Sequence, residues 1–97
     1  MKVLIVVDMQ NDFIDGSLGT KEAVGIVDRA AEVMDSFDGA VICTRDTHFA
    51  GYLETSEGRK LPVEHCIEGT NGHALQEKIQ KMAEKKQAVV MNKVTFG

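Results

Sequence analysis

The run Val3-Leu4-Ile5-Val6-Val7, ended by Asp8, lies at the start of the chain. A continuous apolar run rich in β-branched residues is typical of a strand buried on both faces, as strands of parallel sheets are. Two later runs have the same character, AVICT at 40–44 and AVVM at 88–91. Together the three runs predict three parallel strands.

Two helices are predicted between these strands. Over about 20–37, apolar residues recur at spacings of three and four and form one face, made of Ala23, Ile26, Val27, Ala30, Ala31, Met34 and Phe37. A second helix is expected to begin at Thr70 or Asn71 and to run to about Lys86, with an inward face of Leu75, Ile79, Met82 and Ala83. The alternation of strands and helices predicts an α/β fold with right-handed crossovers, the first half of a doubly wound sheet.

Composition indicates one small domain with no affinity for polyanions. The chain has 97 residues, 43% of them hydrophobic, and its 11 Lys and Arg against 15 Asp and Glu give a net charge of −4. This balance argues against nucleic-acid binding, and no apolar run approaches the roughly 20 residues of a membrane helix. We expect a cytoplasmic protein whose two cysteines, Cys43 and Cys66, are reduced thiols.

Ionisable residues follow each predicted strand. Asp8 follows the first, Arg45 and Asp46 follow the second, and Lys93 follows the third. Ligands of open α/β sheets bind beyond the carboxyl ends of the strands, so we expect these groups to meet on one rim of the sheet. The GxGxxG, GxxxxGK[ST] and GxSxG motifs are absent, which argues against the corresponding phosphate-binding and serine-hydrolase sites.

A long loop, 45–69, carries candidate metal ligands. Asp46 and His48 are two residues apart, and side chains at this spacing on an extended segment face the same way. His65, from the same loop, can complete the set. A carboxylate and two imidazoles suit Zn²⁺, Mn²⁺ or Fe²⁺, while ordinary hydrogen-bonded loop residues are the alternative interpretation.

Four motifs together resemble a known family. LIVVDMQNDFIDGSLG at 4–19, CTRDTHF at 43–49, LPVEHCIEGTNG at 61–72 and NKVTFG at 92–97 are similar in order and spacing to the isochorismatase-like cysteine hydrolases, and within them to the nicotinamidases. The resemblance implies a three-layer α/β fold, a parallel sheet with helices on both faces. Residues 1–97 would be the N-terminal portion of one such domain, with its first three strands and two helices.

The resemblance also implies roles for individual residues. Asp8 and Lys93 match the aspartate and lysine of an Asp-Lys-Cys triad, and the family cysteine belongs to a later turn, beyond this chain. Asp46, His48 and His65 match residues that hold a divalent metal, which in turn holds the pyridine nitrogen of the substrate; Zn²⁺ is expected first. Phe13 matches an aromatic residue that faces the substrate ring, although a core anchor is an equal alternative.

The leading functional hypothesis is therefore an amide hydrolase of the nicotinamidase type, which acts on a small-molecule amide through a cysteine thioester. Two alternatives remain: an isochorismatase-type hydrolase of a vinyl ether, and a catalytically inactive fragment or interaction module. Cys43 lies within a predicted strand and Cys66 is adjacent to His65, so neither is expected to be the nucleophile. We expect a homo-oligomer or a complementary C-terminal half as partner, and no amide hydrolysis by the 97 residues alone.

Overall fold

The computed structural model describes residues 2–94, so the last three residues of the NKVTFG motif lie outside the described residues. Its centre is a parallel sheet of β1 (Val3–Val7), β2 (Ala40–Asp46) and β3 (Val89–Lys93), in that spatial order. In the register, Ile5 lies opposite Ile42, and Ile42 lies opposite Val89. The three predicted strands and the α/β class are confirmed.

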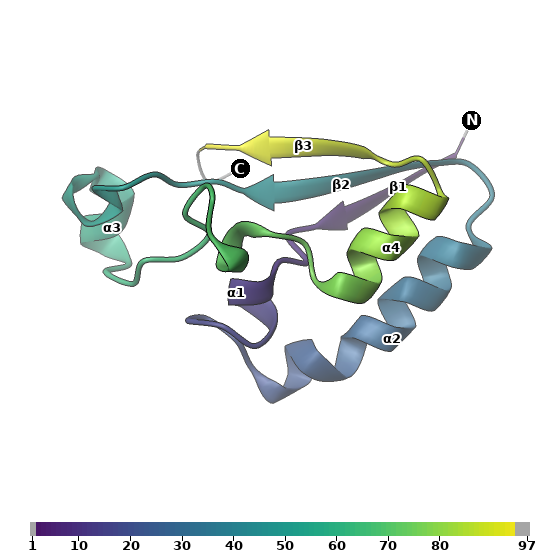
Figure 1. The fold of residues 1–97 in the computed structure, drawn as a ribbon, viewed down its shortest axis with the longest axis horizontal. Helices are drawn as coiled ribbons and strands as arrows, with labels where there is room; N and C mark the ends of the chain where they lie inside the picture. Colours follow the sequence, from purple (N-terminus) through teal and green to yellow (C-terminus); the bar gives the residue numbers. More distant parts are fainter. Residues whose placement is uncertain (1, 95–97) are drawn as a thin grey trace.

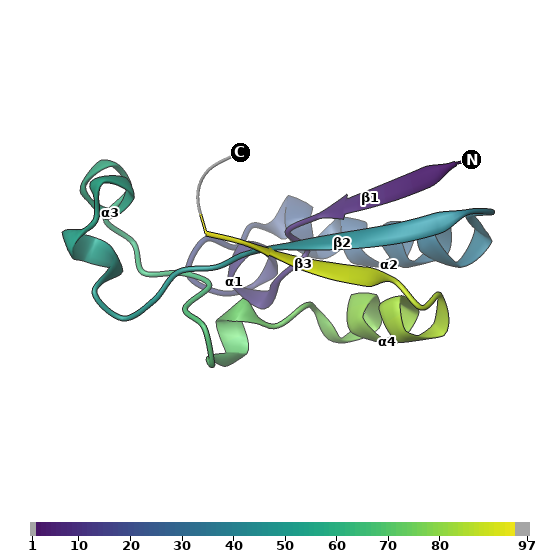
Figure 2. The same ribbon diagram turned by 90° about the horizontal axis from the view of Figure 1, so that it is seen from above.

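Two longer helices connect the strands, α2 (Lys21–Ser36) and α4 (Glu77–Lys85). They pack against each other and lie on the same side of the sheet (Figures 1 and 2). Both crossovers move one strand in the same direction, and right-handed crossovers of this kind place their helices on one face. In the described part of the chain, no helix is long and apolar enough to cross a membrane.

The core lies between the sheet and these two helices. Buried side chains from all of these layers form it, among them Val6, Met34, Val41, Cys43, Ile79 and Ala83. Ile26, which the helical pattern placed on the inward face of α2, is exposed. Charged contacts join the outer edges of the helices: Lys85 Nζ lies 2.6 Å from Asp35 Oδ1, and Lys78 pairs with Asp28.

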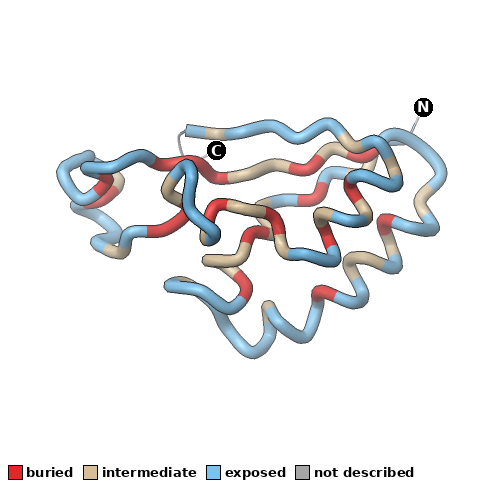
Figure 3. Tube along the Cα trace, in the orientation of Figure 1, coloured by how far each residue is buried: buried red, intermediate tan, exposed pale blue. Residues whose placement is uncertain are grey.

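The opposite face of the sheet is open. Its large exposed side chains are 46–59% accessible and apolar: Val3, Ile5, Val7, Val89 and Met91. Figure 3 shows exposed stretches along both outer strands of the sheet, β1 and β3. The prediction that these strands are buried on both faces is therefore wrong for the described residues, whose helices cover one face alone. A contiguous apolar surface on a sheet is unusual for a monomer and is typical of an interaction surface.

The second helix begins later than predicted. Residues Asn71–His73 form a short 3₁₀ turn, Leu75 pairs with Gln10 in an antiparallel bridge, and the helix begins at Glu77. Gln76 caps it, its Oε1 accepting from the Lys78 amide at 2.7 Å. The start at Thr70 or Asn71 is wrong because tertiary pairing with the segment after β1 holds 74–76 extended.

Three further short helices lie at the carboxyl end of the sheet. They are α1 (Asn11–Ile14), the 3₁₀ helix Tyr52–Glu54 and α3 (Ser56–Lys60). The last two belong to the long loop after β2, which Figure 1 shows projecting beyond the strand ends. The fold thus brings the segments after β1 and β2 and the end of β3 to one rim.

Candidate active site and metal centre

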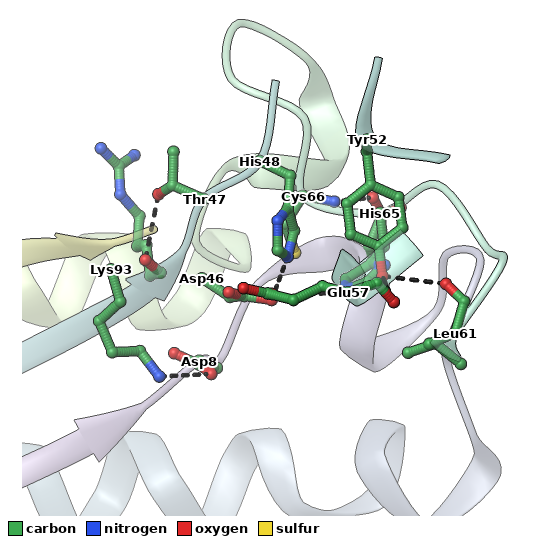
Figure 4. Close-up of polar contacts among 12 residues, drawn as sticks. Asp8, Asp46, Thr47, His48, Tyr52, Glu57, Leu61, His65, Cys66 and Lys93 are labelled. Atoms are coloured by element: carbon green, nitrogen blue, oxygen red, sulfur yellow. Dashed lines mark hydrogen bonds and ion pairs between the residues drawn. The ribbon is translucent and has the colours of Figure 1, made fainter. Parts of the chain in front are cut away.

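Asp8 and Lys93, 85 residues apart, meet at this rim. Lys93 Nζ lies 3.1 Å from Asp8 Oδ2, and the two side chains are 29% and 21% exposed (Figure 4). Thr44 Oγ1 donates a hydrogen bond to Asp8 Oδ1 at 2.8 Å and accepts one from the Asp8 amide at 3.2 Å. Asp8 has a φ of 53°, a left-handed conformation that turns the chain sharply at the end of β1. A carboxylate and an ammonium are therefore held together at the edge of the open face.

Asp46, His48 and His65 converge beside this pair. Asp46 Oδ2 lies 3.0 Å from His48 Nε2 and 3.3 Å from His65 Nε2, and all three residues are buried (Figure 4). One ligand atom from each lies within 4.8 Å of the others, a spacing that suits one bound cation. The i, i+2 geometry of Asp46 and His48 agrees with the sequence prediction.

The hydrogen bonds of His65 fit a metal ligand. Its Nδ1 lies 2.7 Å from the Val63 carbonyl, which can only accept, so Nδ1 carries the proton. In the neutral ring, Nε2 then presents a lone pair toward the Asp46 carboxylate, another acceptor. A cation bound by both Nε2 and the Asp46 carboxylate removes this repulsion. In addition, metal-bound histidines usually donate a hydrogen bond from their other ring nitrogen to a carbonyl or carboxylate, as Nδ1 does here. The residues therefore fit a divalent metal.

Aromatic rings enclose the histidines. The centroid of Phe13 lies 5.5 Å from that of His65, and Tyr52 lies 4.5 Å from His48 and 5.1 Å from His65. The Tyr52 hydroxyl donates to the Leu61 carbonyl at 2.9 Å. Burial raises the pKa of Tyr52, and the nearby charges of Glu57 and Asp46 add to this effect. Tyr52 thus remains a neutral wall of the site.

The segment that carries His65 is tied to α1. Cys66 has a φ of 50°, and its amide donates to Asp12 Oδ2 at 2.8 Å. Ser17 Oγ donates to the Glu64 carbonyl at 3.0 Å. Sequence reasoning assigned no role to Asp12, Thr44 or Tyr52, because their contacts depend on segments distant in sequence. For Asp12, its place in the 4–19 motif that carries the family resemblance was the available signal.

Neither cysteine lies in surroundings that would activate its thiol as a nucleophile. Cys43 is fully buried among the core residues on the helix side of β2, whereas the neighbouring Thr44 faces Asp8. Burial raises the pKa of Cys66 to about 12, and the charges of Asp46, Asp12 and Asp8 act in the same direction. At neutral pH the Cys66 thiol therefore stays protonated, which agrees with the sequence prediction that it is not catalytic.

A family comparison and a comparison with solved structures both find proteins similar to this chain. The isochorismatase domain family matches residues 2–97, while none of the curated proteins searched matches the chain. The structure is similar to the nicotinamidase/pyrazinamidase of Bacillus subtilis, with 29% identity and a TM-score of 0.82, over 95% of this chain and 55% of that one.

Two further structures widen the comparison. The zinc complex of the Pyrococcus horikoshii pyrazinamidase is 31% identical, with a TM-score of 0.70 over 97% of this chain and 52% of that one. The N-carbamoylsarcosine amidase of Thermoplasma acidophilum is 32% identical, with a TM-score of 0.77 over 94% of this chain and 50% of that one. The chain thus spans about half the length of these structures. Because the family match covers nearly every residue, the chain belongs to the isochorismatase domain family of hydrolases.

Proposed function

We propose that this chain forms the N-terminal part of an amide hydrolase of the nicotinamidase type. The observation that carries the proposal is the meeting of the Asp8–Lys93 pair with Asp46, His48 and His65 at one rim of the sheet. Structural similarity to a nicotinamidase/pyrazinamidase and to a second amidase supports C–N hydrolysis as the reaction class. The substrate class is a small carboxamide, and nicotinamide is the first candidate.

Asp8 and Lys93 serve a cysteine thiol supplied by a segment outside these 97 residues. The Lys93 ammonium favours the thiolate, and Asp8 accepts the thiol proton. The sulfur attacks the carboxamide carbon, and the C–N bond breaks as Asp8 returns the proton to the nitrogen. Ammonia leaves, and water then hydrolyses the thioester to the carboxylate and restores the thiol. One carboxylate thus serves as base and then as acid.

Asp46, His48 and His65 would hold the divalent metal, with Zn²⁺ favoured and Mn²⁺ or Fe²⁺ as alternatives. A metal bound there would supply an electrophilic site for a ring nitrogen of the substrate. Phe13 lies against His65 on this side and would contact the substrate ring. The zinc complex of the Pyrococcus horikoshii pyrazinamidase supports zinc at a site of this type.

The segment that supplies the thiol is also a candidate to cover the open face. This face ends at Lys93, which lies opposite Asp46 in the register, so a segment packed there reaches the proposed catalytic pair. The similar structures are about twice as long as this chain, which supports a complementary C-terminal half as the covering segment.

An isochorismatase-type hydrolase of a vinyl ether is the second candidate, because the family name includes it. Metal content separates the two, since the metal has a substrate-binding role in the first alone. Protein freed of metal and then dialysed against Zn²⁺ should retain one equivalent by elemental analysis. His48→Ala should retain less than a tenth, whereas Asn11→Ala, which removes a side chain that bonds the Asn71 carbonyl away from the proposed ligands, should retain one equivalent. Equal zinc in wild type and His48→Ala would contradict the metal site.

Substrate recognition can be tested without turnover. With Co²⁺ in place of Zn²⁺, nicotinamide should change the visible absorption bands of the metal, because its ring nitrogen enters the metal coordination sphere. Benzamide has the same carboxamide and no ring nitrogen, so it should leave the bands unchanged. The same response to both amides, or none to nicotinamide, would contradict the proposed substrate class.

A further inference from the structure

Gln10 is fully buried and lies next to the proposed metal centre without contributing a ligand. It precedes α1 and belongs to the segment that leads away from Asp8. Its side-chain amide makes three hydrogen bonds. Nε2 donates to the carbonyls of Asp46 at 2.8 Å and His73 at 2.9 Å, and Oε1 accepts from the Asp46 amide at 2.8 Å.

These hydrogen bonds take the place of the backbone pairing that a longer β1 would give to the end of β2. β1 pairs with β2 as far as Val7 and Thr44, and the chain then turns away at Asp8. Asp46 is the last residue of β2, so its N–H and C=O on the β1 side would have no strand partner. The Gln10 amide, which has the same donor and acceptor groups as a peptide, pairs with both. A buried peptide group left unpaired loses its hydrogen bonds to water with no replacement, so this pairing favours one conformation of Asp46.

Both peptide groups that flank the Asp46 side chain are thereby fixed. On the β3 side, the Thr47 amide, which shares a peptide group with the Asp46 carbonyl, donates to the Lys93 carbonyl at 2.6 Å and holds that group from its other side. The fixed backbone sets the Cα–Cβ direction from which the Asp46 carboxylate reaches His48 and His65. Gln10 also joins the segment that carries Asp8 to the strand end that carries Asp46.

We propose that Gln10 is a positioning residue, which sets the direction of the Asp46 carboxylate and so the geometry of the metal centre. The inference rests on the proposed metal site. Glutamine suits the position because a carboxylate lacks the two donors, and an apolar side chain lacks both donors and acceptor. Residues that orient metal ligands in this way typically change metal affinity about 10- to 100-fold when substituted.

The test compares Co²⁺ spectra and Co²⁺ affinities of the 97-residue chain and its variants. Gln10→Glu keeps the shape and removes the Nε2 donors, and Gln10→Met removes all three bonds. Asn11→Ala is the matched control, because Asn11 lies in the same segment and its Nδ2 donates at 2.8 Å to the Asn71 carbonyl, away from the ligands. Ile79→Ala opens a cavity in the core and controls for general loss of stability.

We expect both Gln10 variants to shift the Co²⁺ bands and to bind Co²⁺ about 10- to 100-fold more weakly, while Asn11→Ala and Ile79→Ala keep the wild-type spectrum. A folded Gln10 variant with the wild-type spectrum and affinity would overturn the inference. So would the failure of both Gln10 variants to fold, since Gln10 would then support the fold as a whole. If the wild type itself binds no Co²⁺, the proposed metal site fails, and the inference fails with it.

Discussion

At the scale of single residues, the site depends on hydrogen bonds among buried polar residues that neighbour the proposed ligands and are not ligands themselves. His73 is buried, and its Nε2 lies 2.9 Å from Thr47 Oγ1, while its carbonyl accepts from Gln10. Thr47 in turn follows Asp46 directly. A change in the charge of His73 therefore acts on the backbone beneath the proposed metal centre.

This arrangement predicts a loss of stability in mild acid. Burial lowers the pKa of His73, and the charge of Arg45 acts in the same direction. The unfolded chain, with a histidine pKa of about 6.5, then binds the proton more readily than the folded chain. The contribution of His73 to stability is therefore complete above about pH 6.5 and is lost as the pH falls below the lowered pKa.

Urea unfolding at pH 7 and pH 5 tests this expectation. The wild type should lose more stability over this range than His73→Gln, which cannot take up the proton. Other groups that titrate in the range are common to both proteins, so their effects cancel in the comparison. Parallel losses in the two proteins would show that His73 does not carry this dependence.

At the scale of elements, the hydrophobic pattern predicted the strands and helices whose positions depend on local sequence. The three strands and the body of α2 follow from apolar runs and helical spacing. The start of α4 does not, because the pairing of Leu75 with Gln10 overrides the local preference of residues 71–76 for helix. Asp46 and His48 were placed together by strand periodicity, whereas the approach of His65 depends on how the long loop folds.

Two glycines give opposite predictions for stability. Gly25 lies within α2 with no atom near the position of an added β-carbon, so Gly25→Ala should stabilise the chain by about 1 kcal/mol. At Gly72 an added β-carbon would overlap the Asp12 carboxylate, which holds the Cys66 amide. Gly72→Ala should therefore destabilise the chain by about 1–3 kcal/mol. Urea midpoints measure both changes, and a shift of the same sign for the two variants would contradict this account.

At the scale of the whole molecule, the proposed catalytic and metal groups lie at the edge of an uncovered sheet. The helices lie on one face of the sheet (Figure 2). On the other face, the exposed apolar residues of β1 and β3 are followed by Asp8 and Lys93 at the strand ends. The chain thus holds a proposed acid–base pair and proposed metal ligands, while both of its thiols lie in the buried interior. A covering segment would close the site and complete it.

The purified chain should therefore release no ammonia from nicotinamide above background, because neither thiol can act with Asp8 and Lys93. Cys43→Ser and Cys66→Ser should behave as the wild type does. An enzymatic rate of roughly 1 per second or faster that one of these variants abolishes would identify that cysteine as the nucleophile and would contradict the proposal.

The central claim is that one divalent cation binds between Asp46, His48 and His65. Anomalous diffraction at the zinc edge, from crystals of the zinc-loaded chain, tests it most directly. We predict a peak about 2.0–2.2 Å from a carboxylate oxygen of Asp46 and from Nε2 of His48 and His65. A zinc-saturated crystal with no peak among these three residues, or with its peak on Cys66, would contradict the claim.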